Sequence, residues 1–329
     1  MRLTTIDAVT VERLISAAVA APSIHNTQPW RYRLDPDTAT LEVRAAPERG
    51  LRHTDPCGRA LLVSVGAAVF NLRVAVTHLG WEPVVRLLPV PSEPTLLASV
   101  ALRGSSASHG ARHSADLYDV LWRRRSSRFP FSDRHRPSPE LLAELSQAAQ
   151  TEGATLSFPP PAQTERLLRL TAEAERRNAQ DPDRRAENRA WVRDGATDGM
   201  PGASLGQQDP TGRMPLRNFT GLRPMHNGLP GAAFESRPVI GVLSTAHDRR
   251  ADWLRAGQSL QHVLLTATAR GVQSSLLHQA IEWPDLRWAL AAAPEAPGHV
   301  QMLVRLGYGP HGPATPRRPA RDVLDGDGE

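Results

Sequence analysis

Two stretches of the chain, GAAVFNLRVAVTHLGW at residues 66–81 and GQSLQHVLLTATARGV at residues 257–272, decide the fold. Each is the apolar second part of a long predicted helix, and the glycines that bound the two helical stretches have the same spacing, 66 to 80 and 257 to 271. A helix ending in paired alanines precedes each stretch, and a strand ending in glycine, LASVALRG or QMLVRLG, follows it. This matching order predicts a tandem duplication of a domain of roughly 100 residues.

Local signals predict an α+β fold for each repeat. Ser138-Pro139-Glu140 starts a helix with proline at its first position and an acidic residue in its first turn. Apolar residues at helical spacing predict helices over residues 7–21, 59–79, 138–149, 164–177 and 253–270. Alternating apolar residues predict strands over residues 30–34, 41–43, 84–88, 97–102, 239–243 and 300–306.

The repeats divide the chain unequally. A Ser-, Gly- and His-rich linker at residues 104–113 predicts a first unit over residues 1–114 and a second over residues 115–329. The second unit carries an insertion at about residues 176–236, rich in Gly, Pro, Asp, Asn and Arg, which we expect to form a structureless lid. Apolar anchors favour a docked lid, namely Trp191, Met200, Leu205, Met214, Leu216, Phe219 and Met225.

Composition limits the possible partners. The 329 residues include 39 basic ones, all arginine, and 34 acidic ones, which give a net charge of +5. The absence of lysine is explained by GC-rich codons, and the mixing of both charges along the chain argues against a nucleic-acid surface. Nucleic-acid binding is therefore the least favoured hypothesis for the function, and we expect no nucleic-acid partner.

The sequence favours a cytoplasmic protein. It has one cysteine, so no intrachain disulfide can form, which fits a reducing compartment. The N-terminal segment does not resemble a signal peptide. The longest apolar stretch, residues 60–76, is interrupted by Asn71 and Arg73 and is short for a membrane span. We expect no membrane partner.

Four other side chains are weaker candidates for chemistry. Cys57 follows Asp55-Pro56 at a helix start, where its pKa could fall, but a structural thiol is the commoner case. His109 and His113 have a spacing that suits a metal ion, but no third ligand is evident, and we expect no metal. His25 could face a pocket as a contact to substrate.

Two polar stretches stand out as binding sites. PSIHNTQPW at residues 22–30 lies between a helix and a strand, and its Asn26 and Gln28 amides could pair with a ring edge that has both donors and acceptors. The alternative is a loop with local turns. RRRSSRF at residues 123–129 offers guanidinium groups and hydroxyls that suit a phosphate, or else forms a solvated turn. Arg317-Arg318 is a third candidate phosphate contact.

Together these stretches resemble the FMN-dependent nitroreductase superfamily. The resemblance is carried by PSIHNTQPW, RRSSR, AGQSLQHVLLTATARG, VRLGYG and RRPARDV, in that order along nearly the whole chain. More narrowly, HNTQPWRY, DPCGRALLVSVGAAVFNLRVA and the lid segment WVRDGATDGMPG resemble the Acg-like subfamily, in which two nitroreductase units are fused. The resemblance implies an intrachain pseudo-dimer of two mixed-sheet units with flanking helices and a lid.

The resemblance also implies a composite flavin site. In family dimers one subunit supplies the RRSxR segment and a C-terminal Arg or Lys, and the other supplies PSxxNxQPW. Here PSIHNTQPW occurs only in the first repeat, and RRSSR occurs only with the second repeat. The two half-sites make one complete site, so one FMN per chain is expected between the repeats. The implied contacts are Pro22, Ser23, Asn26 and Gln28 to the ring; Arg124, Ser126, Arg317 and Arg318 to the phosphate and ribityl chain; Arg128 to the N1–C2 edge; and Ser275 and Leu276, within residues 273–277, to N5.

The implied activity is that of an oxidoreductase. NADPH or NADH would reduce FMN, and electrons would pass to a nitro, quinone-like or other small acceptor, with no catalytic side chain required. The alternative is a protein that stores FMN under its lid and turns over little. The length of the lid and the absence of a Pro-x-Glu-Gly-like turn near residue 273 favour that alternative. Because one chain contains both halves of the pseudo-dimer, the protein could be a monomer.

Overall fold

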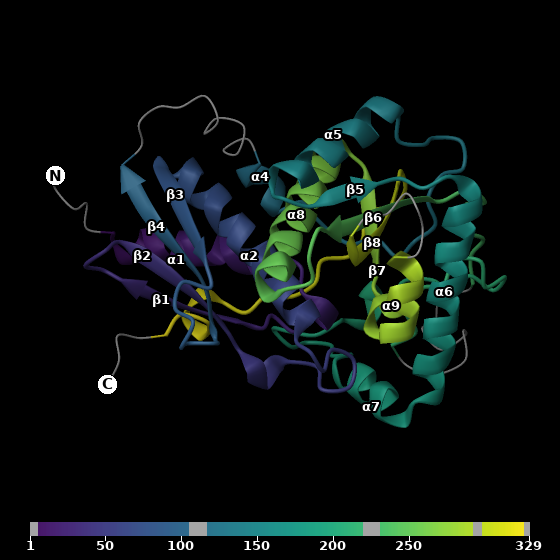
Figure 1. Cartoon of the computed structure of the whole chain (residues 1–329), viewed down its shortest axis with the longest axis horizontal. Helices are drawn as coiled ribbons and strands as arrows, with labels where there is room; N and C mark the ends of the chain where they lie inside the picture. The colour runs from purple at the N-terminus through teal and green to yellow at the C-terminus, as the bar shows by residue number, and fades with distance from the viewer. Residues whose placement is uncertain (1–5, 105–116, 220–230, 292–297, 326–329) are drawn as a thin grey trace.

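The computed structural model describes residues 6–104, 117–219, 231–291 and 298–325. Two four-stranded antiparallel sheets lie on either side of two long helices, α2 (Arg59–His78) and α8 (Arg250–Ala269), which pack against each other (Figure 1). The predicted α+β fold of two related units is confirmed.

The two sheets have the same strand order. The first runs β1-β2-β4-β3 and the second β5-β6-β8-β7, all neighbours antiparallel. The register shifts at the same place in both, between Val43 and Arg44 and between Leu243 and Ser244. The strands are β1 (Trp30–Asp35), β2 (Thr40–Ala45), β3 (Trp81–Leu87), β4 (Leu96–Gly104), β5 (Thr155–Ser157), β6 (Val239–Thr245), β7 (Gln273–Leu277) and β8 (His299–Gly307).

Side chains cap the starts of two helices. The Asp7 carboxylate accepts a hydrogen bond from the backbone N–H of Thr10, and the Ser138 hydroxyl accepts one from that of Leu141. Both satisfy amides that the first turn of a helix leaves unpaired. The remaining helices are α1 (Ala8–Val19), α4 (Tyr118–Leu121), α5 (Pro139–Thr151), α6 (Pro161–Gln180), α7 (Pro182–Ala190) and α9 (Pro284–Ala291).

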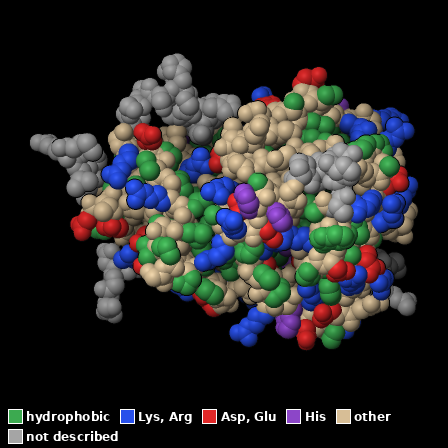
Figure 2. Space-filling view, viewed as in Figure 1, with side chains coloured by type: hydrophobic (Ala, Val, Ile, Leu, Met, Phe, Trp, Pro, Cys, Tyr) green, Lys and Arg blue, Asp and Glu red, His purple; other side chains and the backbone are tan. Residues whose placement is uncertain are grey.

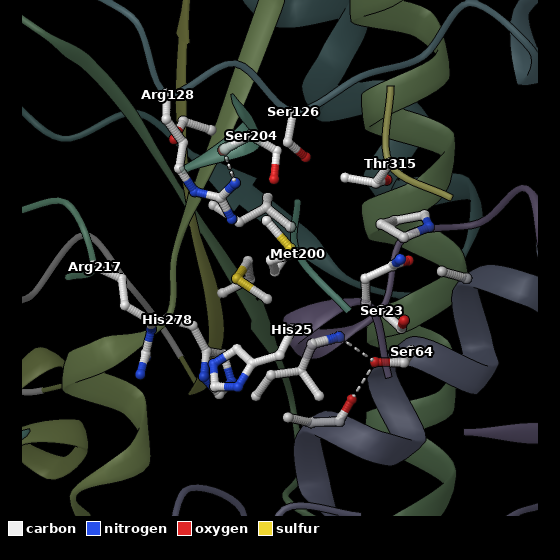
Figure 3. Close-up of a pocket in the computed structure, with 18 of the residues that line it drawn as sticks. Ser23, His25, Ser64, Ser126, Arg128, Met200, Ser204, Arg217, His278 and Thr315 are labelled. Carbon is white, nitrogen blue, oxygen red and sulfur yellow. Dashed lines mark hydrogen bonds between the residues drawn. The ribbon is translucent and has the colours of Figure 1, made fainter. Parts of the chain in front are cut away.

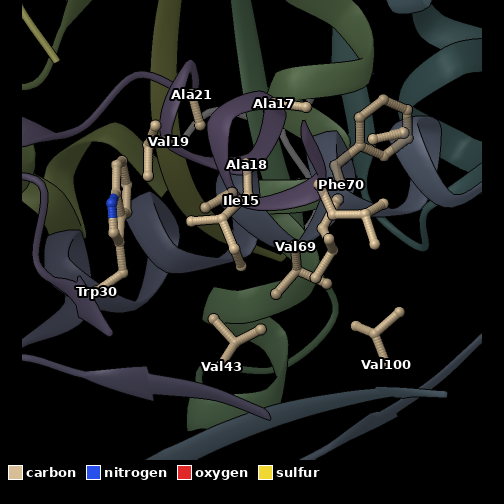
Figure 4. Packing of buried hydrophobic residues seen from close by; sticks show 14 of the residues in the cluster. Ile15, Ala17, Ala18, Val19, Ala21, Trp30, Val43, Val69, Phe70 and Val100 are labelled. Atoms are coloured by element: carbon tan, nitrogen blue, oxygen red, sulfur yellow. The ribbon is translucent and has the colours of Figure 1, made fainter. Parts of the chain in front are cut away.

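The core of the first unit lies between its helices and its sheet. Ile15 of α1 and Val69 of α2 pack towards Val43 and Val100 of the sheet, and all four are fully buried (Figure 4). The 20-residue α2 is long and apolar enough to span a membrane, which the sequence argument from length had excluded. However, 89% of its most apolar window is buried inside the protein, so α2 is a core helix.

The chain crosses between the units twice. Val120 and Leu121 of α4 pack in the core of the first unit, although the sequence boundary at residue 114 assigns α4 to the second. After β8, the C-terminal tail returns to β1, where the backbone N–H of Tyr32 donates to Val323 O at 2.8 Å (Figure 1). The tail therefore brings residues 315–318 alongside the first unit.

The insertion lies between β5 and β6, where the first unit has only the turn at residues 36–39. It is not structureless, because α6 extends to Gln180 and α7 follows. The Asp181 carboxylate caps α7 by accepting hydrogen bonds from the N–H groups of Asp183 and Arg184, a local signal that composition hides. The predicted anchors Met200, Leu205, Met214, Leu216 and Phe219 are buried, Trp191 is half-buried, and Met225 lies outside the described residues.

Surface charges of both signs are interspersed. Figure 2 shows arginine side chains and carboxylates side by side over the visible face. Several arginines form ion pairs with neighbouring carboxylates, as Arg33 does with Glu42 and Arg270 with Glu144, each at 2.8 Å. Such pairs stabilise a surface little, but they leave fewer unpaired positive charges for a polyanion.

Candidate functional site

A cavity opens between the two units, beneath the insertion. The first unit contributes the loop between α1 and β1 and one face of α2, and the second contributes β7 and the segment that follows α4. The tail and the insertion complete the wall. Of the predicted site residues, those lining the cavity are Pro22, Ser23, Asn26, Arg124, Ser126, Arg128, Ser275, Leu276 and Arg317.

The loop between α1 and β1 is held in an unusual backbone conformation. His25, Asn26 and Gln28 all have positive φ, at 47°, 54° and 51°. Non-glycine residues rarely adopt this region, and such strain persists where surrounding bonds enforce it. Here the Ser23 hydroxyl accepts from the N–H of Gln28 at 2.9 Å, and the Ser64 hydroxyl of α2 accepts from the N–H of Ile24 at 3.1 Å.

The Asn26 amide lines the cavity but bonds to protein. Its Nδ2 donates to Gly199 O at 2.8 Å and to Pro316 O at 3.0 Å, and its Oδ1 accepts from Arg317 at 2.9 Å. The Asn26 amide thus joins three segments of the chain in this structure, and its expected pairing with a ligand ring stays a prediction. A buried amide must satisfy its polar atoms, and these partners are distant in sequence.

Gln28 and Arg318 lie outside the cavity lining. The Gln28 Nε2 donates to Thr197 O at 2.9 Å, and its Oε1 accepts from the backbone N–H of Arg318 at 2.8 Å. The Arg318 guanidinium donates to Asp322 O. In this structure both residues tie the tail and the insertion to the loop, and their expected contacts with a ligand stay predictions.

One end of the cavity is lined by the arginine side chains Arg124, Arg125 and Arg317. Arg124 is 3% exposed, and among the described residues its Nε and Nη1 have no hydrogen-bond partner, nor does the Nε of Arg317. Burial and then the neighbouring Arg125 lower the pKa of Arg124 to about 10, and burial followed by Arg124 and Arg125 lowers that of Arg317 to about 9. Both stay charged at neutral pH, so an anion placed here would gain charge-assisted hydrogen bonds.

Arg128 lies along a different wall, nearer the insertion. Its Nη1 donates to Ser204 O at 2.9 Å, and its guanidinium lies over the Phe219 ring at 5.3 Å. Burial and the nearby Arg217 lower the pKa of Arg128 to about 10. The same segment is attached to β7, because the backbone N–H of Ser127 donates to Ser274 O at 2.8 Å. This contact holds Ser275 and Leu276 at the cavity.

A buried charge network forms the back of the cavity. His278 Nε2 lies 2.6 Å from Arg59 Nη2, and His278 Nδ1 lies 2.9 Å from Glu282 Oε1. Arginine can only donate, so Nε2 accepts and the ring proton sits on Nδ1, facing Glu282. Burial lowers the pKa of His278 to about 4 despite Glu282, so the ring is neutral. Glu282 also pairs with Arg217 of the insertion.

Several of these lining residues escaped sequence reasoning. His25 had been weighed as a contact, Arg125 belongs to the candidate stretch RRRSSRF, and Met200 and Phe219 had been predicted as anchors of the lid. No local signal marks Arg217 or His278, because they reach the cavity only through the packing of distant segments. Figure 3 shows His25, Arg217 and His278 on one side of the cavity and Ser126 and Thr315 on the other. The further lining residues outside the predicted set include Ser64, Arg125, Met200, Ser204, Phe219 and Thr315.

The weaker candidates lie elsewhere. Cys57 is exposed and does not line the cavity. His109 and His113 lie outside the described residues. Within the described part of the chain, no group of three His, Cys, Asp or Glu side chains is arranged to hold a metal ion.

The cavity residues fit FMN. Apolar side chains between the two polar ends leave a lining suited to a flat ring, namely Ala60, Val63, Ala67, Leu260, Leu276 and Met302. The unpartnered nitrogens of Arg124 and Arg317 suit a phosphate at one end. A ligand with one anionic end and a planar, largely apolar body matches this distribution.

Comparisons with known proteins agree on one family, although no family model matches the chain. It is 33% identical over 327 residues to "Putative NAD(P)H nitroreductase Rv3131" of Mycobacterium tuberculosis H37Rv, covering 97% of this chain and 92% of that protein. It is 30% identical over 329 residues to "Putative NAD(P)H nitroreductase acg" of the same strain, covering 95% of each.

Solved structures of similar proteins include two nitroreductases. One, from Anabaena variabilis ATCC 29413, has a TM-score of 0.49 and 12% identity over 92% of this chain and 88% of its own. The other, NfnB from Mycobacterium smegmatis in complex with NADPH, has a TM-score of 0.34 and 15% identity over 59% of this chain and 88% of its own. On the sequence identity of the M. tuberculosis relatives over nearly their whole length, this chain belongs to the nitroreductase family of flavin-dependent oxidoreductases, in the group that includes Acg.

Proposed function

We propose that the protein binds one FMN between its two units and acts as an NAD(P)H-dependent reductase of a nitro, quinone-like or other small acceptor. The observation that carries this proposal is that the buried Arg124 and the half-buried Arg317 each have guanidinium nitrogen without a hydrogen-bond partner among the described residues, namely Nε and Nη1 of Arg124 and Nε of Arg317. One comes from the segment after α4 and the other from the C-terminal tail. Without an anion, their burial is costly; a phosphate between them removes that cost.

Each unit supplies what the other lacks. Arg124 and Arg317 donate to the phosphate, and the Ser126 hydroxyl is placed to bind the adjoining chain. The loop from Pro22 to Asn26 closes the opposite side with α2. Bound FMN would supply the ring that takes up hydride and releases electrons. The Arg128 guanidinium, which Ser204 O holds in place, provides a positive charge at the ring that favours electron uptake.

The insertion excludes water from the cavity. Met200, Leu216 and Phe219 are buried and line it. A dry cavity strengthens the attraction between the arginines and an anionic ligand. No side chain need act as an acid or base for the flavin to be reduced, so these residues act by position and charge.

A second candidate, a protein that stores FMN, is favoured by the way the insertion is fastened. Gln28 bonds to Thr197, Asn26 to Gly199, and Arg49 forms an ion pair with Asp198. These bonds join residues 197–199 to the loop at the cavity. If they do not open, nicotinamide cannot reach the ring, and the bound flavin stays oxidised.

One experiment tests both candidates. The visible spectrum of the purified protein is recorded, and NADPH and then NADH are added without oxygen. We expect a flavin spectrum that bleaches, which is followed by an acceptor screen. A flavin spectrum that persists favours storage. No flavin, and none taken up from added FMN, would contradict both.

We also propose the domain organisation, oligomeric state, location and partners of the protein. We expect two units that divide near residue 114, a monomer, a cytoplasmic location, and no nucleic-acid or membrane partner. The single exposed Cys57 and the pairing of surface arginines with carboxylates support these expectations. Sedimentation of the FMN-loaded protein would test the oligomeric state directly.

A further inference from the structure

One wall of the cavity carries polar atoms that the FMN contacts leave unused. His25 is 6% exposed, and among the described residues both of its ring nitrogens lack a hydrogen-bond partner. Arg217 is 8% exposed, and its Nη1 also lacks one there. Both side chains line the cavity. Unpaired polar atoms at this depth are costly, so this wall is suited to a polar ligand group.

This wall is separate from the phosphate end. Figure 3 shows His25, Arg217 and His278 together, with Ser126 and Thr315 at the other side of the cavity. The first wall joins the α1–β1 loop to the insertion, whereas the phosphate end joins the segment after α4 to the tail. Arg128 lies between them: Arg217 contributes to lowering the pKa of Arg128, and Arg128 contributes to lowering that of His25.

The charges along this wall favour an anion. Arg217 pairs with Glu282, which also binds Arg184 and the neutral His278. Arg59 and Arg128 add two positive charges, and Glu175 is the other carboxyl near Arg217. Of these groups, Arg217 and Arg128 line the cavity and neither carboxylate does, so the charges that face a ligand at this wall are positive.

His25 complements Arg217 as a donor. Burial and the neighbouring Arg217, His278 and Arg128 hold its pKa well below the ordinary value, so its ring is neutral at physiological pH. A neutral imidazole has one N–H to donate. The edge of the Phe219 ring lies against it, with centroids 5.0 Å apart, which leaves an aromatic surface beside the two donors.

We propose that His25 and Arg217 form the recognition site for a carboxylate on a small aromatic electron acceptor. The inference rests on the proposed function, since it assigns the acceptor class of the same cavity. Arg217 Nη1 and the His25 N–H donate to the carboxylate, and Phe219 packs against the ring that bears it. The depth of the wall favours a compact anionic group over the phosphates of a dinucleotide.

The test uses the oxidised, FMN-loaded protein without reductant. Two acceptors of the same shape, 4-nitrobenzoate and 4-nitrobenzamide, are titrated while the flavin absorbance is followed. We expect the carboxylate to bind at least about 10-fold more tightly, as charge-assisted hydrogen bonds predict. Arg217→Gln and His25→Phe should each remove most of that preference. Arg213→Gln, an exposed arginine of the same insertion, should keep it.

Each outcome decides between the hypotheses. FMN affinity is measured first for every variant, so failure to bind flavin counts against the proposed function itself. Intact FMN binding with equal affinity for the two nitro compounds overturns the acceptor assignment alone. A lower affinity for NADPH but unchanged preference in Arg217→Gln would assign the wall to the dinucleotide instead. If Arg217→Gln does not fold, because Glu282 loses a partner, His25→Phe provides the test.

Discussion

Gly66 of α2 and Gly257 of α8 face each other where the two helices cross. A Cβ added at Gly66 would lie 2.2 Å from Leu254 O, and one added at Gly257 would lie 2.1 Å from Val63 O. Gly66 and Gly257 occupy the same position in the two sequence repeats. The two repeats therefore contact each other through equivalent residues. Glycine here lets the helix backbones approach more closely than any side chain permits.

Gly66→Ala and Gly257→Ala should each destabilise the protein by about 2–4 kcal/mol, because the clash is with backbone that cannot move aside. Alanine is normally the better helix former by about 1 kcal/mol, so a loss of stability identifies the clash. Thermal unfolding of the FMN-free protein measures it. Gly104→Ala is the control, since nothing lies within 4 Å of its added Cβ. A double variant should cost less than the sum.

Arg124→Met should affect binding and stability in opposite directions. Without ligand, Arg124 is a buried charge with unpartnered nitrogens, so its removal should leave the FMN-free protein as stable or more so. FMN affinity should fall roughly 10- to 100-fold with the loss of charge-assisted bonds. Fluorescence titration with FMN and a thermal melt measure the two effects. The exposed neighbour Arg123→Met should change neither, and an unchanged FMN affinity in Arg124→Met would disprove the phosphate site.

Asn26→Ala and Arg128→Ala test whether the site is shared between the units. Asn26 belongs to the first unit and acts through the bonds that place Arg317 and Gly199. Arg128 belongs to the second and faces the cavity directly. Both substitutions should weaken FMN binding by roughly 10-fold, measured by the same titration. If neither does, the flavin does not lie between the units.

Asp198→Asn should loosen the insertion. The Asp198 carboxylate pairs with Arg49 and with Arg193, which lies 4.5 Å over the Trp191 ring. Breaking both ion pairs should speed FMN release several-fold, measured by exchange against excess riboflavin. Faster anaerobic reduction by NADPH in this variant would show that the insertion limits nicotinamide access. Asp194→Asn, an exposed carboxylate in the same segment, is the control, and identical release rates would argue against a fastened lid.

Stability should fall on mild acidification. The pKa of His278 is about 4 in the folded protein and about 6.5 when unfolded. The unfolded chain therefore binds the proton more readily, and stability present above pH 6.5 is lost as pH falls towards 4, by up to about 3 kcal/mol. His25 acts in the same direction. Thermal melts of FMN-free protein from pH 7.5 to 4.5 should be less pH-dependent in His278→Gln. The same dependence in both proteins would mean that His278 is not the group responsible.

Much of the fold could be predicted because its signals are local. The caps at Asp7 and Ser138, the apolar stripes and the glycine spacing specified the main helices and strands and showed that the repeats correspond. The motif segments likewise indicated which loops line the cavity. Composition misled at the insertion, where a local cap at Asp181 starts a helix within a stretch rich in loop-forming residues.

The tertiary structure alone decided which side chains face the cavity. Arg317 lines it and its neighbour Arg318 does not: the Arg317 guanidinium donates to Asn26 at the cavity, whereas the Arg318 guanidinium donates to Asp322 O of the tail. The side-chain amides of Asn26 and Gln28 bond to partners that lie between 169 and 291 positions away in the sequence. The sequence therefore could not predict that protein groups take up their hydrogen bonds. The residue type determines which hydrogen-bond donors and acceptors a side chain has. Whether they bond to protein or stay available for a ligand depends on which distant segments the fold brings within about 3 Å.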